Sequence, residues 1–76
     1  MKSMTIKLDS IDKVKKFVNL SNRFEGDIDL VSNRYTVDAK SIMGIFSLNL
    51  SEPLTLKVYN EEEFDEIAQA LADYAV

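Results

Sequence analysis

Histidine, cysteine and tryptophan are absent from this sequence of 76 residues, and glycine and proline are scarce, at two residues and one. Without cysteine the chain forms no disulfide and no thiolate metal site, and without histidine it lacks the most common zinc ligand and general base. No stretch approaches the roughly 20 apolar residues of a membrane span, and the N-terminus has no apolar run long enough for a signal peptide. We therefore expect no metal, no cofactor, no membrane association and a cytoplasmic location.

The length and composition favour one small folded domain over residues 1–76. Apolar residues make up 46% and charged residues 29%, which is ordinary for a globular domain and too apolar for a disordered chain. A domain of this size buries only about 60% of the surface of its unfolded chain, which leaves no room for a deep catalytic cleft between lobes. We expect a monomeric protein that is not an enzyme.

Charge is unevenly distributed along the chain, whose formal net charge is −4. Residues 1–40 carry a net charge of +2, and residues 41–76 carry −6. Direct nucleic-acid binding needs a basic face that displaces counterions from phosphates, so the acidic half disfavours it. The tyrosines Tyr35, Tyr59 and Tyr74 lie far apart and form no row on which bases could stack. The sequence therefore predicts no direct contact with nucleic acid.

Alternation of apolar and polar residues predicts four strands, each with one buried face. A turn is expected at Ser32-Asn33 between the second and third strands, because asparagine tolerates left-handed backbone geometry. Pro53 suits the entrance of the fourth strand but not its interior. The predicted strands cover residues 4–8, 27–30, 35–37 and 54–58.

Residues 9–22 are typical of an amphipathic helix. Asp9 or Ser10 suits its N-cap, and we expect the helix to end near Asn22. Three lysines at positions 13, 15 and 16 fall on the polar side, where we interpret them as a solvated face. The apolar positions share the other face and are expected to be buried: Ile11, Val14, Phe17 and Val18.

Two further helices are predicted in the second half of the chain. A short helix follows an N-cap near Lys40 or Ser41, and a last helix spans about 61–74. Asn60 and Glu63 resemble a capping box at the start of the last helix. Its apolar stripe consists of Phe64, Ile67, Ala68, Leu71 and Ala75. The resulting order, β-α-β-β-α-β-α, favours an α+β fold in which three helices cover one face of a four-stranded antiparallel sheet.

The segment from Val37 to Leu48, with Lys-Ser-Ile-Met-Gly at its centre, resembles the regulatory-serine segment of HPr. HPr is the histidine-containing phosphocarrier of the bacterial phosphotransferase system. The residues from Phe24 to Leu30 resemble the approach to the second strand of that family and the strand itself. The resemblance covers nearly the whole chain and implies the HPr-like open-faced β-sandwich.

The same resemblance places Ser10 where the family has its phosphoryl-accepting histidine. Asp12 stands where the family has an arginine, and Lys13 where it has a proline. Phosphohistidine transfer is therefore not expected. Two alternatives stay open: a phosphocarrier with another acceptor, such as Ser10, Asp12 or the neighbouring Asp9, and an inert mimic that sequesters phosphotransferase-system partners.

Ser41 corresponds to the serine that HPr kinase/phosphorylase modifies in many members of the family. Paralogues that keep this serine but lack the histidine act as corepressors with a catabolite-control transcription factor. Ser41 also suits a plain helix N-cap, a role that is compatible with phosphorylation. More apolar residues follow than one narrow helix face can hide, so the resemblance implies a protein-docking patch of Ile42, Met43, Gly44 and Phe46. Gly44 would either let a partner approach closely or relieve crowding.

Overall fold

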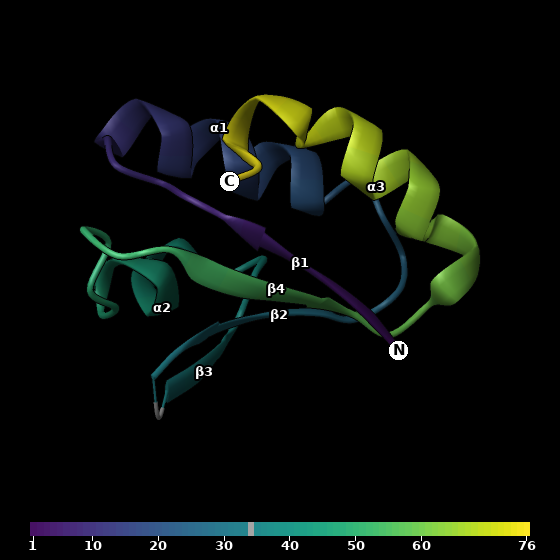
Figure 1. The fold of residues 1–76 in the computed structure, drawn as a ribbon, viewed down its shortest axis with the longest axis horizontal. Helices are drawn as coiled ribbons and strands as arrows, with labels where there is room; N and C mark the ends of the chain where they lie inside the picture. The colour runs from purple at the N-terminus through teal and green to yellow at the C-terminus, as the bar shows by residue number, and fades with distance from the viewer. Residues whose placement is uncertain (34) are drawn as a thin grey trace.

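The computed structural model describes residues 1–33 and 35–76 and confirms the predicted α+β architecture (Figure 1). Four antiparallel strands form one sheet in the order β1-β4-β2-β3. Three helices lie on one face of this sheet, and the other face is open. The strands are β1 (Lys2–Ile6), β2 (Ile28–Ser32), β3 (Tyr35–Asp38) and β4 (Leu54–Val58). The helices are α1 (Ile11–Ser21), α2 (Ile42–Phe46) and α3 (Phe64–Ala70), with 3-10 turns η1 (Glu61–Glu63) and η2 (Ala72–Tyr74) on either side of α3.

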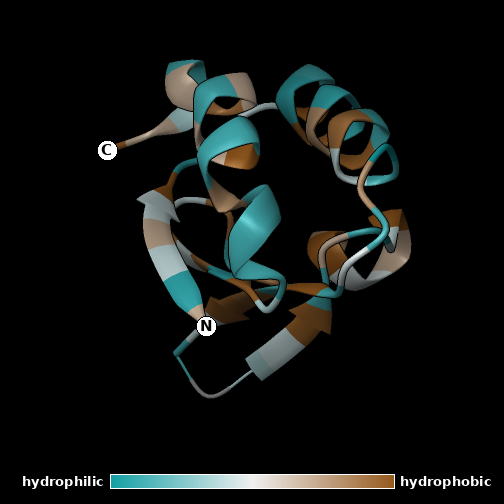
Figure 2. Ribbon diagram, turned by 90° about the vertical axis from the view of Figure 1, so that its right-hand side faces the viewer, coloured by the Kyte–Doolittle hydropathy of each residue, from teal (hydrophilic) through white to brown (hydrophobic). Residues whose placement is uncertain are grey.

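The core lies between the sheet and the helices. Leu56 of the central strand β4 pairs with Met4 on one side and Leu30 on the other, and Leu30 pairs with Val37. This row of apolar side chains crosses all four strands and packs in or against the core. In the ribbon of Figure 2, the apolar residues, coloured brown, recur along both the strands and the helices. Each large side chain that is buried here contributes about 1.5–3 kcal/mol relative to exposure.

The hairpin turn between β2 and β3 follows the predicted chemistry. Asn33 adopts a φ of 52°, in the left-handed region that asparagine tolerates better than most residues. The strand register places Ser32 opposite Tyr35 across this turn.

The first strand begins and ends two residues earlier than its apolar alternation predicts, at Lys2–Ile6 instead of 4–8. β1 ends at Ile6, and Leu8 is fully buried but lies outside the strand. Beyond this point the C-terminal segment runs along the edge of β1: Lys7 N–H donates to the Tyr74 carbonyl at 2.9 Å, and Val76 N–H donates to the Thr5 carbonyl at 3.1 Å. The alternation of apolar residues predicts which side chains are buried, but it does not predict where the hydrogen-bonded pairing of β1 with β4 ends.

The predicted continuous helix over 61–74 is instead three successive pieces, η1, α3 and η2. Ile67 and Leu71 are buried as expected. Ala75 is exposed and forms a β-bridge with Ile6, so the prediction that it belongs to the apolar stripe of the helix is wrong. The reason is tertiary: the chain turns out of the helix to pair with the edge of the sheet.

The predicted capping box at the start of this segment is only half formed. The Asn60 side chain caps the turn by accepting from Glu62 N–H at 3.1 Å. The Glu63 carboxylate does not return to Asn60, but accepts from the N–H groups of Gly26 at 3.0 Å and Glu25 at 3.3 Å. Glu63 therefore ties the loop after α1 to the start of the last helical segment.

Gly26 provides a test of this tie. A Cβ at position 26 would lie 2.6 Å from the Asn60 Cβ and 2.8 Å from Glu63 Oε1, so Gly26→Ala forces the two segments apart. We expect a loss of about 1–3 kcal/mol in the free energy of unfolding, measured by urea titration. Gly44→Ala is the comparison, because its Cβ would meet neighbours only at 3.3 Å, and it should lose less. Equal stability of Gly26→Ala and the parent would contradict the close approach.

Candidate functional site

Ser10 is the N-cap of α1, which confirms one of the two predicted N-caps, Asp9 and Ser10. Its backbone is extended, with φ −146° and ψ 157°, and its Oγ accepts from Lys13 N–H at 3.2 Å. Its carbonyl accepts the first helical bond, from Val14 N–H at 3.1 Å. The exposed Ser10 hydroxyl therefore already has a structural role at the position where the resemblance implies a histidine.

An ion pair lies beside Ser10. Lys13 Nζ is 2.9 Å from Asp9 Oδ1, and both side chains are roughly half-exposed. The hydrogen bond and the positive charge of Lys13 lower the pKa of Asp9 below its ordinary value. The ion pair with Asp9 thus engages the Lys13 ammonium, which is one of the cations next to Ser10. The exposed Asp12 carboxylate forms no ion pair within the described residues and adds a negative charge. The surroundings of Ser10 are therefore not a concentrated positive site for phosphate.

Ser41 is the N-cap of α2. Its Oγ accepts from Gly44 N–H at 3.2 Å, and its side chain is half-buried. Lys40 is held on the other side, because its Nζ donates to the Phe24 carbonyl at 2.6 Å and its N–H donates to Asp38 Oδ1 at 2.9 Å. The lysine of the Lys-Ser pair thus secures the loop after α1, whereas the serine secures the start of α2.

The apolar residues of α2 divide between the core and the surface. Met43 is 79% exposed and Phe46 is 43% exposed, as expected for a surface patch. Ile45 is buried, and Ile42 is half-buried against the core. A Cβ on Gly44 would lie 3.3 Å from both Ser41 Oγ and Val37 Cβ, which favours relief of crowding as the role of this glycine.

Ile11 corrects the predicted buried face of α1. It is 62% exposed, whereas Val14 and Phe17 are fully buried. The first turn of α1 extends beyond the edge of the core, so a residue with the right helical phase has nothing beneath it. Sequence periodicity could not show this, since it gives the direction of a side chain but not the extent of the core.

An open groove of about 590 Å³ connects the N-terminus of α1 to α2 and the loop that follows it. Ile11 and Phe46 contribute exposed apolar surface, and Leu50 is half-buried. The structure thus places Ser10 and Phe46 in one groove and adds Lys7, Leu50 and Ser51, which the sequence interpretation did not include. The groove is lined by Lys7, Asp9, Ser10, Ile11, Phe46, Leu50 and Ser51.

The described residues contain no group of three or more side chains suited to hold a metal ion. No helix among them is long and apolar enough to cross a membrane.

Comparison with known families agrees with this geometry. A family model described as the PTS HPr component phosphorylation site matches residues 12–75. The chain belongs to the HPr family. The matched range begins two residues after Ser10, so it leaves out the position at which HPr-family carriers are expected to hold the histidine.

Solved HPr structures are similar over almost their whole length. HPr-C-His from Thermoanaerobacter tengcongensis is 31% identical with a TM-score of 0.80, and the match covers 96% of this chain and 89% of that one. A phosphocarrier protein HPr from Bacillus anthracis is 32% identical with a TM-score of 0.73, covering 99% and 94%. A histidine-containing phosphocarrier protein of Mycoplasma, at 17% identity and a TM-score of 0.73 over 95% and 86%, shares the fold.

The lowered pKa of Asp9 predicts a measurable pH dependence. Because the folded-state pKa lies below the ordinary value of 3.8, the ion pair contributes stability above that pH and loses it as pH falls through the folded pKa. In Lys13→Met, the pKa of Asp9 should rise toward its ordinary value, as followed by carboxyl NMR. Lys15→Met is the matched control, and an Asp9 pKa that responds equally to both substitutions would assign the shift to general charge.

Proposed function

We propose that this HPr-family protein is a non-catalytic regulatory module that binds protein partners and does not carry phosphohistidine. One observation carries the proposal: the chain contains no histidine, and the position where the family is expected to hold it is Ser10, which caps α1. A carrier needs an adduct with high transfer potential. A phosphoimidazole has one, whereas a serine phosphate ester is far less reactive.

The charge next to Ser10 supports the same conclusion. An arginine at the position of Asp12 would attract an incoming phosphoryl group, whereas the exposed Asp12 carboxylate repels it. Lys13 does not restore the balance, because it pairs with Asp9 at 2.9 Å. Of the alternative acceptors Ser10, Asp9 and Asp12, the first is engaged as a helix cap and the second in an ion pair.

The docking surface that we assign consists of the exposed side chains of Ile11, Met43 and Phe46, together with the groove between Ser10 and Phe46. Exposed apolar side chains of this size are typical of protein-binding surfaces. Phosphotransferase-system components, HPr kinase/phosphorylase and a catabolite-control regulator are the partners to test, because they fit the family.

We further propose that phosphorylation of Ser41 switches this surface. Ser41 lies one residue before Ile42 and two before the exposed Met43, so a phosphate on Oγ would add nearly two negative charges beside the patch. The modified oxygen is the one that accepts from Gly44 N–H at 3.2 Å. The alternative role, an inert mimic that sequesters phosphotransferase-system partners, requires the same docking surface but no phosphorylation of Ser41.

Incubation with enzyme I and radiolabelled phosphoenolpyruvate tests the absence of carrier function. We expect no transferable phosphoryl group on this protein under conditions that label an ordinary HPr completely. Label that passes from this chain to a sugar-specific component would overturn the proposal and favour the acceptor alternatives, which Ser10→Ala and Asp12→Asn would then separate.

Incubation with HPr kinase/phosphorylase and ATP tests the switch. We expect one phosphate, located at Ser41 by mass spectrometry and lost in Ser41→Ala. An unmodified protein, alongside a modified ordinary HPr, would leave Ser41 as a helix cap only.

Truncation of the patch tests the docking surface. Met43→Ala and Phe46→Ala should each weaken binding to whichever of the three candidate partners binds the parent protein, by about 1 kcal/mol or more if they lie at the centre of the contact. Because both side chains are exposed, the melting temperature should change little. Val31→Ala, on the strand β2, is a control distant from the groove. A large loss of stability in both patch variants would instead make them core residues.

A further inference from the structure

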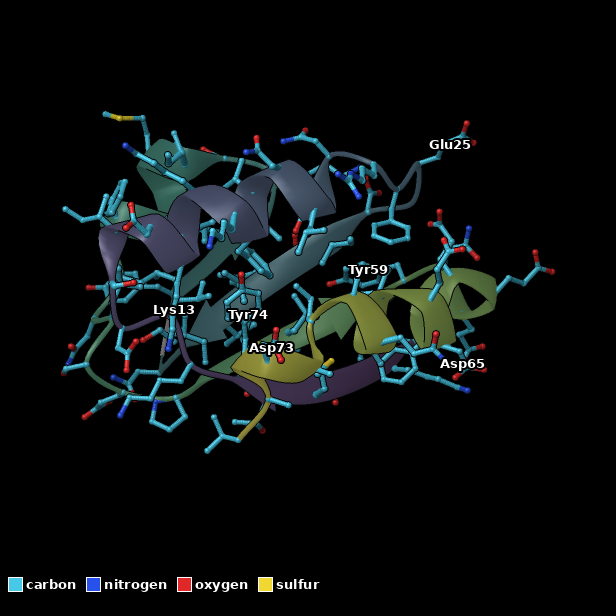
Figure 3. The ribbon with its side chains drawn as sticks, turned by 90° about the horizontal axis from the view of Figure 1, so that it is seen from above. Lys13, Glu25, Tyr59, Asp65, Asp73 and Tyr74 are labelled. Carbon is cyan, nitrogen blue, oxygen red and sulfur yellow. The ribbon has the colours of Figure 1, made fainter. Side chains whose placement is uncertain are left out.

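A second groove lies on the other side of α1, away from Ser10. Its α1 wall is a stripe of side chains spaced three or four residues apart, and its other wall comes from the last helical segment. Figure 3 shows Asp73 and Tyr74 on η2, with Tyr74 lying between η2 and α1. The groove has a volume of about 340 Å³ and is lined by Lys16, Asn19, Leu20, Arg23, Ala70, Asp73 and Tyr74.

The floor and the rim of this groove differ in chemistry. Leu20 and Tyr74 are half-buried and pack against the core, so they form an apolar floor. Ala70 contributes only a methyl group, which leaves the space between the walls open. Lys16 and Arg23 are exposed on the α1 wall, and Asp73 is exposed on the opposite wall. The groove is therefore polar at its rim and apolar underneath.

Lys16 lies on α1, whereas Arg23 lies in the turn two residues after α1 ends at Ser21. In the part of the chain that the structure describes, neither Lys16 nor Arg23 forms an ion pair, and neither does Asp73. This contrasts with Lys13 on the same helix, which pairs with Asp9. Both cations of this groove are therefore available to an anionic partner, on a protein whose net charge is −4.

We propose that this groove binds an extended acidic segment of a partner protein. An extended segment that follows the groove and has a carboxylate toward each end can contact both Lys16 on α1 and Arg23 in the turn after it. The Asn19 amide can both donate to and accept from the peptide backbone, and the Asp73 carboxylate accepts from its N–H groups. A nucleic acid fits less well, because its phosphates offer no donor to Asp73 and are repelled by it. This proposal does not depend on the function assigned to the Ser10 and Phe46 groove.

Hexaglutamate is the probe for this groove, with hexaglutamine as the uncharged peptide of equal length and a dT6 oligonucleotide as the other anion. In ¹⁵N–¹H NMR titrations at low ionic strength, hexaglutamate should shift amides of residues 16–23 and 70–74 and leave those of residues 42–46 in place. Binding should weaken at about 0.15 M salt, where charges separated by more than about 8 Å are screened. Hexaglutamine should bind much more weakly.

Charge-matched variants decide whether the groove is responsible. Lys16→Gln/Arg23→Gln should weaken hexaglutamate binding about fivefold, the loss expected for two exposed charge contacts. Lys15→Gln/Lys57→Gln removes the same net charge outside the groove and should bind as the parent does. Equal weakening in both double variants, shifts scattered over all the lysines, or tighter binding of dT6 than of hexaglutamate would overturn the proposal. Lys15, Lys16 and Arg23 are exposed and Lys57 is half-buried, so the amide spectrum of each variant is recorded first to verify that it is folded.

Discussion

Burial of one face of the sheet is the constraint on which the rest of the molecule depends. The central strands β4 and β2 place Leu54, Leu56, Val58 and Leu30 fully out of contact with water, which requires helices to cover them. α1 provides Phe17 and α2 provides Ile45 for this cover. Once these side chains are fixed inward, Ile11 at the start of α1 and Phe46 at the end of α2 remain exposed, and both line the groove at Ser10. The position of the candidate site therefore follows from the extent of the hydrophobic core.

Polar contacts between loops give this arrangement its precision. The Glu63 carboxylate binds the backbone at Gly26, and the Lys40 ammonium binds the carbonyl of Phe24. Both contacts converge on the loop between α1 and β2, one from the residue before Ser41 and the other from the turn before α3. They relate α1 to α2 and to the last helical segment, which the sheet alone does not do. Charged side chains that would be assigned to the surface from the sequence thus act as connections.

The sequence predicted features that depend on neighbours within the chain. The strands β2 and β4, the turn at Asn33 and the caps at Ser10 and Ser41 follow from local periodicity and hydrogen bonding, and so does the exposure of Met43. The features that it predicted wrongly depend on distant contacts. Ile11 has helical phase but no core beneath it, and residues 61–74 divide into three pieces because their end pairs with β1. Glu63 has the spacing of a capping box, but a distant loop offers it two N–H groups instead. The groove between α1 and η2 joins segments about fifty residues apart, so nothing in local spacing could predict it.

The pairing of residues 74–76 along β1 has a consequence for the sheet as a whole. Strand edges with free N–H and C=O groups are templates on which further chains can add and aggregate. Here the hydrogen bonds at Thr5 and Lys7 occupy part of one edge. An incoming strand must first displace the final residues to pair with this part of the β1 edge, and the other edge of the sheet is the four-residue β3. The C-terminal residues thus protect the protein against uncontrolled self-assembly at the β1 edge.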